Sequence, residues 1–97
     1  MPSERPGAAG ARVKPWETPP GVPRYKQLAK VLRERIVKDR VGWRPGDKIP
    51  AEPAIGAESG YSRETVRAAI REPRSEGLIE VVLGVGSYVS DKSKWKI

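Results

Sequence analysis

The 97-residue chain carries 19 lysines and arginines against 12 acidic residues, and its net charge of +7 favours a polyanionic partner such as nucleic acid. It has no cysteine and no histidine, which excludes disulfides and ordinary zinc sites and removes the commonest general base. We therefore expect no enzyme, no metal and no cofactor, and because no apolar run could form a signal peptide or membrane span, a cytoplasmic protein without a membrane partner.

Residues 1–23 hold six of the ten prolines and three of the ten glycines. Such a stretch buries too little apolar surface to offset the entropy lost on ordering, so we expect a disordered arm. Its three basic and two acidic residues give a net charge of +1, which leaves +6 of the total +7 for residues 24–97. The basic character therefore belongs to the part of the chain that is expected to fold.

An amphipathic helix is predicted over residues 24–39, entered just after Pro23. Its apolar residues recur at three- and four-residue spacing and form one wall of a core, while charged residues cover the other faces. Most of these charges belong to a solvated surface, but Arg33 is a candidate phosphate contact. The apolar positions are Tyr25, Leu28, Ala29, Leu32 and Ile36.

The segment after this helix is rich in turn-forming residues, and the Pro-Gly pair at residues 45–46 suits a type II turn. Trp43 is expected to cover the edge of the core. Residues 48–50 are long enough only for a minimal strand. Arg44 and Lys48 are further candidate phosphate contacts on this segment.

Two helices joined by a short glycine-containing turn follow, which is the arrangement of a helix-turn-helix. The first covers residues 52–59, Gly60 should end it in the left-handed conformation, and Ser62 should cap the second. We expect the second helix to kink or stop near residues 71–72. The reason is Pro73, which removes one hydrogen bond and clashes with the preceding turn.

The start of this second helix has the chemistry needed to read a DNA major groove. Arg63 and Arg67 lie four residues apart on one side, where each could contact a guanine edge, clamp a phosphate or remain an ordinary surface arginine. Thr65 could contact a thymine methyl group or a phosphate. Glu64 could accept from cytosine or only favour the helix dipole.

Two β-prone runs around a Gly-x-Gly turn, within residues 78–90, predict a β-hairpin. No helix follows this turn, so a nucleotide-binding loop is not expected. The element order is that of an α+β winged helix-turn-helix, with three helices, a short strand and a C-terminal hairpin wing. We assign this domain to residues 24–90 and leave residues 91–97 as a tail or the start of a linker.

Five motifs occur in order along residues 24–90. They are Tyr25-x-Gln27-Leu28-Ala29, Pro45-Gly46-Asp47-x-Ile49-Pro50-Ala51-Glu52, Gly60-x-Ser62-Arg63-x-Thr65-Val66-Arg67-x-Ala69-Ile70, Glu76-Gly77-Leu78-Ile79 and Gly84-x-Gly86-Ser87-Tyr88-Val89. In this order and spacing they resemble the DNA-binding domain of the GntR-type bacterial transcription regulators. The first motif looks most like the HutC-like or YtrA-like branches.

The resemblance implies a homodimeric repressor that binds a short palindromic operator in double-stranded DNA. The third helix of such proteins enters the major groove and the tip of the wing reaches the adjacent minor groove. Whether the isolated domain dimerises stays open. The positions that match contact residues of the family are Ser62, Arg63, Thr65 and Arg67, together with Gly84, Val85 and Gly86 at the wing tip.

Two arginines that the family usually carries are missing from this chain. Pro53 stands where helix 2 of the family has an arginine that contacts DNA, and Leu83 stands where the wing has an arginine before its first glycine. Arg63 and Arg67 would then carry most of the sequence readout. The alternative function is a degenerate winged helix that acts as a protein–protein interaction module.

Overall fold

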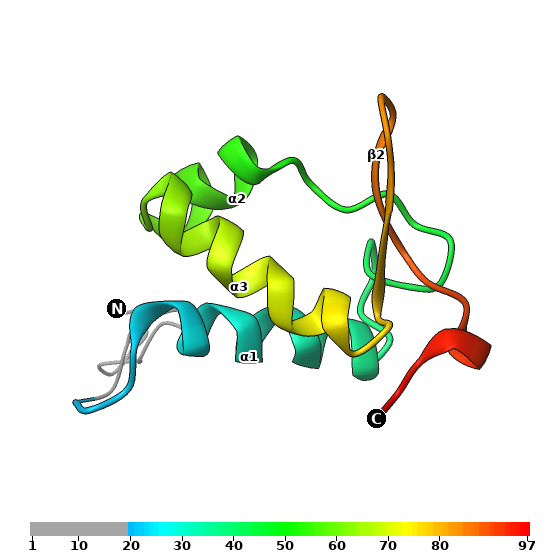
Figure 1. Cartoon of the computed structure of the whole chain (residues 1–97), viewed down its shortest axis with the longest axis horizontal. Helices are drawn as coiled ribbons and strands as arrows, with labels where there is room; N and C mark the ends of the chain where they lie inside the picture. The colour runs from blue at the N-terminus through cyan, green and yellow to red at the C-terminus, as the bar shows by residue number, and fades with distance from the viewer. Residues whose placement is uncertain (1–19) are drawn as a thin grey trace, which may run out of the picture.

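The computed structural model describes residues 20–97, and the greater part of the predicted arm therefore lies outside the described residues (Figure 1). Three helices are followed by an antiparallel hairpin, which confirms the predicted winged helix-turn-helix. The elements are α1 Arg24–Val37, α2 Glu52–Ser59, α3 Arg63–Ser75, β1 Ile79–Val82, β2 Gly86–Val89 and the short 3-10 helix η1 Lys92–Lys94.

Helix α1 packs along α3 and supplies one wall of the core, as its apolar spacing predicts (Figure 1). It ends at Val37, two residues before the expected end, because Asp39 adopts a left-handed backbone with φ +58°. Lys26 Nζ lies 2.9 Å from a carboxylate oxygen of Glu72 on α3. This hydrogen bond and the carboxylate charge raise the pKa of Lys26.

The core lies where the three helices meet the base of the hairpin. Trp43 joins it at 7% exposure, so the expected lid over the core edge is confirmed, and the Arg35 guanidinium lies 5.4 Å from its ring centroid. The ring is therefore covered by a cation on its outer side. The buried members of the core are Leu28, Ala29, Leu32, Ile36, Trp43, Ile49, Ile55, Val66, Ala69, Ile70, Leu78, Ile79 and Val89.

Helix α3 continues through Pro73 to Ser75, so the prediction of a kink or stop near residues 71–72 is wrong. Pro73 lies in the last turn of the helix, and its missing N–H leaves one carbonyl, that of Ala69, without its helical donor. Beyond it, the Glu76 N–H donates to the Glu72 carbonyl at 3.1 Å and the Leu78 N–H to the Pro73 carbonyl at 2.9 Å. The proline ring is also fully buried, so it contributes apolar packing at this position.

The hairpin pairs Ile79 with Val89 and Val82 with Gly86. The predicted minimal strand is present as an isolated bridge between Lys48 and Tyr88 on the free edge of β2. It follows a turn in which the Asp47 N–H donates to the Arg44 carbonyl at 2.8 Å and Gly46 has φ +90°. A positive φ at the third position of the turn fits the predicted type II turn.

The C-terminal residues fold back onto the body instead of projecting from it (Figure 1). Asp91 caps η1 by accepting from the Ser93 N–H at 2.9 Å, and this hydrogen bond lowers the pKa of the Asp91 carboxyl. The Trp95 indole donates to the Ser90 carbonyl at 3.1 Å, and its ring packs partly buried against the core. The Lys96 N–H then reaches the Glu76 carbonyl at 2.8 Å.

Candidate nucleic-acid interface

The N-terminus of α3 is built by the turn that precedes it. Gly60 ends α2 with φ +80°, which confirms the predicted left-handed cap. Ser62 Oγ then accepts from the Thr65 N–H at 3.2 Å and donates to Thr65 Oγ1 at 2.9 Å. This cap satisfies one N–H of the first turn and leaves others facing outward, where a helix N-terminus favours an anion such as phosphate.

Ser62→Ala should destabilise the protein by about 1 kcal/mol, because the Thr65 N–H loses its acceptor. For a domain of this size that corresponds to a fall in melting temperature of roughly 4–8 °C. Thermal unfolding followed by circular dichroism measures it. Ser62→Asn, which keeps a capping oxygen, is the matched control and should melt near the native temperature. Equal melting of all three proteins would contradict the capping role.

The exposed side of α3 carries a row of four arginines. Arg63, Arg67, Arg71 and Arg74 follow one another at spacings of four, four and three residues, and all four are exposed. Within residues 20–97, no hydrogen bond or ion pair engages the guanidinium groups of Arg63, Arg71 and Arg74. The row therefore presents a line of positive charge along the helix, open to a polyanion.

Arg67 is the one member of the row with a partner among the described residues. Its Nε lies 3.8 Å from Glu52 Oε1 at the start of α2, and the two side chains are 58% and 37% exposed. A pair this exposed contributes little to stability. It places the Arg67 guanidinium beside the start of α2.

Arg71 and Arg74 are candidate site residues that the sequence reasoning missed. The spacing that links Arg63 to Arg67 extends to both, so the signal was present in the sequence. The expected end of the helix near residues 71–72 hid it, because Arg74 shares the face of Arg67 only if α3 continues through Pro73.

A cleft runs between α3 and the wing. One part, with a volume of about 340 Å³, is lined by Arg67, Arg71 and Arg74 and by Ser87 of β2. An adjoining part of about 250 Å³ is lined by Lys48 and the wing residues Val85 and Gly86. The two parts share Glu52, Ile70 and Ser87. We call the whole the α3–wing cleft, and its lining has four cations against one carboxylate.

The other predicted contacts lie at unequal distances from this cleft. Lys48 lies against the wing, because a Cβ added to Gly86 would come within 2.7 Å of Lys48 Cε. Arg44 stays in the loop after α1, where its Nε donates to the Asp39 carbonyl at 3.3 Å. Arg33 pairs with Glu76, which lies at the C-terminal end of α3, opposite to the end that Ser62 caps. The structure therefore does not bring Arg33 to the start of α3.

The other two predicted contacts in the first turn of α3 differ in exposure. Glu64 is exposed in that turn, and Thr65 is half-buried with its hydroxyl engaged by Ser62. A carboxylate there favours the positive end of the helix dipole. Thr65 can still offer its methyl group to a ligand.

The tip of the wing carries no charge. The turn closes with a hydrogen bond from the Val85 N–H to the Val82 carbonyl at 3.0 Å, and Gly84 adopts φ +76°. Leu83 is 92% exposed and Val85 52%. The tip thus consists of apolar side chains on a narrow hairpin, with Gly84, Val85 and Gly86 where the resemblance places them.

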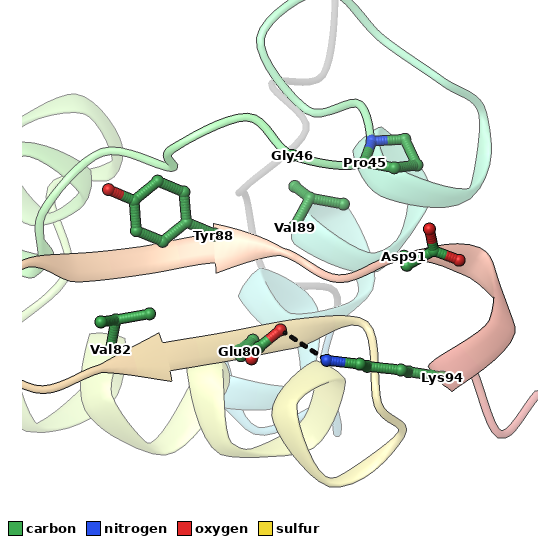
Figure 2. Close-up of a pocket in the computed structure, with 8 residues that line it drawn as sticks. All are labelled: Pro45, Gly46, Glu80, Val82, Tyr88, Val89, Asp91 and Lys94. Carbon is green, nitrogen blue, oxygen red and sulfur yellow. Dashed lines mark hydrogen bonds and ion pairs between the residues drawn. The ribbon is translucent and has the colours of Figure 1, made fainter.

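The opposite face of the wing has a different character. Figure 2 shows a pocket of about 360 Å³ there, between Pro45 and Gly46 on one side and the two strands on the other. The Lys94 ammonium crosses its edge to Glu80 Oε1 at 3.1 Å. Because Glu80, Asp91 and Lys94 all line it, this pocket lacks the positive charge of the α3–wing cleft.

Two kinds of site are not found in the described part of the chain. Among residues 20–97, no cluster of three or more His, Cys, Asp or Glu side chains could hold a metal ion. Over the same residues, no helix has the length and apolar character needed to cross a bilayer.

Comparison with known sequences gives a consistent result. The family described as "Bacterial regulatory proteins, gntR family" matches residues 24–89. The mannosyl-D-glycerate transport/metabolism system repressor MngR of Escherichia coli K12 is 39% identical over 70 residues, which are 72% of this chain and 28% of that protein. The histidine utilization repressor of Klebsiella aerogenes is 38% identical over 69 residues, with 71% and 28% covered. The chain thus spans just over a quarter of the length of these relatives.

Solved structures agree on the fold. A GntR family transcriptional regulator from Listeria monocytogenes superposes with a TM-score of 0.71 at 24% identity, covering 79% of this chain and 67% of that one, which supports the fold alone. The DNA-binding domain of AraR, solved in complex with operator ORX1, superposes with a TM-score of 0.65 at 33% identity, covering 71% of this chain and 81% of that one.

Proposed function

This chain belongs to the GntR family of bacterial regulatory proteins, and on that premise we propose that it represses transcription by binding double-stranded operator DNA. The family is one of regulators, which confirms the expectation that the chain is not an enzyme. The similarity to a histidine utilization repressor agrees with the HutC-like branch. A cytoplasmic location belongs to the same proposal.

The observation that carries the proposal is the row of arginines on α3. Ser62 caps this helix at its start, and the wing lies beside it. An α-helix fits the major groove, which is about 12 Å wide, when its N-terminal turns face the bases. Arg63 and Arg67 then reach base edges, where a bidentate contact to guanine discriminates best. Ser62 and the free N–H groups of the first turn lie near phosphate, and Thr65 near a thymine methyl group or phosphate.

The α3–wing cleft suits the sugar–phosphate strand that separates the major groove from the adjacent minor groove. With α3 in one groove and the wing in the other, this strand has to pass between them. Arg71, Arg74 and Lys48 line that passage and have the charge to bind its phosphates. Arg44 and Arg33, which lie farther away, are assigned no contact in this arrangement.

Two copies on a palindromic operator follow from the same proposal. AraR was solved with operator DNA and MngR is named a repressor, but the chain spans only 28% of MngR. The DNA-binding unit would be residues 24–90, with dimerisation on DNA because each copy reads one half-site. Residues 91–97 pack on this unit in the structure.

Salt dependence of binding tests the proposal. If Arg71, Arg74 and Lys48 each neutralise one phosphate, log affinity per chain falls against log salt with a slope of about −2.7. The duplexes are those enriched by the chain from a random pool, with scrambled duplexes of equal composition beside them. Fluorescence anisotropy at several salt concentrations gives the slope.

Arg74→Ala should make that slope shallower by about 1. It should also weaken binding to enriched and scrambled duplexes equally, because a phosphate contact does not depend on the base sequence. Arg40→Ala is the matched control, since Arg40 is an exposed arginine in the loop after α1. It should leave the slope unchanged. No preference for the enriched duplex in the native chain would overturn the proposed function, and an unchanged slope in Arg74→Ala would remove Arg74 from the interface.

A further inference from the structure

The apolar tip of the wing is not required by the fold. Leu83 is 92% exposed, and no large apolar side chain among residues 20–97 is more exposed. Its backbone φ is negative, so the turn would accept a polar residue at this position. Val85 is 52% exposed beside it, and the sequence has no charged residue between Glu80 and Asp91. Val81 and Val82 are exposed as well, so the tip carries a contiguous apolar patch, which marks an interaction site where a single exposed side chain would not.

The position of the tip indicates what that surface is. The wing lies beside α3, and its tip projects beyond the body. It projects at the top of Figure 1, on the side of the molecule away from α1, where α2 and the start of α3 also lie. At its base, Val81 and Ser87 share the α3–wing cleft with Arg67 and Arg71. A duplex held by α3 therefore meets the tip, and Lys48 packed on Gly86 brings a cation beside it.

The chemistry of the tip selects the mode of contact. The tip itself has no arginine or lysine side chain to insert into the negative potential of a narrow groove. The minor groove is about 6 Å wide, so a hairpin tip enters it only with a small leading side chain. Leucine is among the side chains that minor-groove proteins insert between base pairs, where unstacking widens the groove and bends the duplex.

We propose that Leu83 is a wedge that enters the minor groove next to the half-site and opens a base step there, bending the DNA. The inference rests on the proposed function, since it names how the wing meets the same duplex. The bend runs toward the major groove, as it does for other minor-groove wedges, and is on the order of 20–90°. Binding sites should then carry a flexible TA or CA/TG step where the wing lands, because such steps are easiest to open.

Bending is measured on the full 97-residue chain. A duplex of about 30 base pairs, taken from the enriched pool and labelled at its two ends with a donor and an acceptor dye, reports the end-to-end distance by energy transfer. The native chain should shorten that distance. Leu83→Ala should leave the distance near that of free DNA and weaken affinity about tenfold, which is 1.4 kcal/mol. Leu83→Met, which keeps a long apolar side chain, should bend the duplex.

Val41→Ala is the matched control, because Val41 is 84% exposed but lies in the loop after α1. It should bend and bind like the native chain. Two outcomes on DNA would overturn the wedge while the proposed function stands: a native complex without a bend, or equal bending by the native chain and Leu83→Ala. A third is a dimer that forms without DNA and depends on Leu83, while Leu83→Ala bends the duplex as the native chain does. If the native chain binds no duplex at all, the proposed function falls and the wedge falls with it.

Discussion

Arg67→Ala should abolish the preference for the enriched duplex while the melting temperature of the protein stays nearly unchanged. A bidentate contact to a guanine edge is worth about 1–3 kcal/mol of discrimination, or roughly fivefold to 150-fold in relative affinity. The interaction that Arg67→Ala removes within the protein contributes little to stability by comparison. The Arg67–Glu52 pair is 3.8 Å long, and both side chains are at least one-third exposed. Competition binding between enriched and scrambled duplexes measures the preference.

Arg67→Lys separates charge from geometry. Lysine keeps the positive charge at this position but cannot offer the two parallel N–H groups of a guanidinium. It should therefore retain the affinity for scrambled DNA and lose most of the discrimination. Arg40→Ala again serves as the control outside the interface. An Arg67→Ala protein that still prefers the enriched duplex as strongly as the native chain would refute a reading role for α3.

The elements that local sequence determines were predictable. Helix α2 covers the predicted residues 52–59, Gly60 takes the left-handed cap and Ser62 caps α3. Each depends on interactions within a few residues. The error lay at Pro73, where the effect of a proline depends on how close the helix end lies. That end is set by the buried ring and by the Leu78 N–H, which donates to the Pro73 carbonyl, and neither can be seen in the local pattern.

The candidate site divides in the same way. The row from Arg63 to Arg67 follows from helical periodicity, and the wing tip from its glycines. The tertiary pairings do not follow, because they join residues distant in sequence. Arg33 was predicted as a phosphate contact, because its pair with Glu76 cannot be read from the sequence. Lys48 comes to the wing only through its bridge to Tyr88.

Gly77→Ala should destabilise the domain strongly, because two costs combine. Gly77 has φ +77°, a conformation that costs an L-residue about 1–2 kcal/mol. An added Cβ would also collide with the carbonyl oxygen of Lys94, so the C-terminal residues would have to move. Moving them breaks the hydrogen bond from the Lys96 N–H to the Glu76 carbonyl and displaces Trp95.

Together these losses amount to roughly 2–4 kcal/mol, which lowers the melting temperature on the order of 10–30 °C. Gly84→Ala isolates the first cost, because Gly84 has φ +76° but nothing within 4 Å of an added Cβ. Calorimetry gives both melting temperatures, and hydrogen exchange at the Trp95 indole N–H, which donates to Ser90, reports the position of the tail. If both variants melt alike and the Trp95 indole N–H exchanges freely in the native protein, Lys94 is not packed on Gly77, and residues 91–97 are a free linker instead of part of the domain.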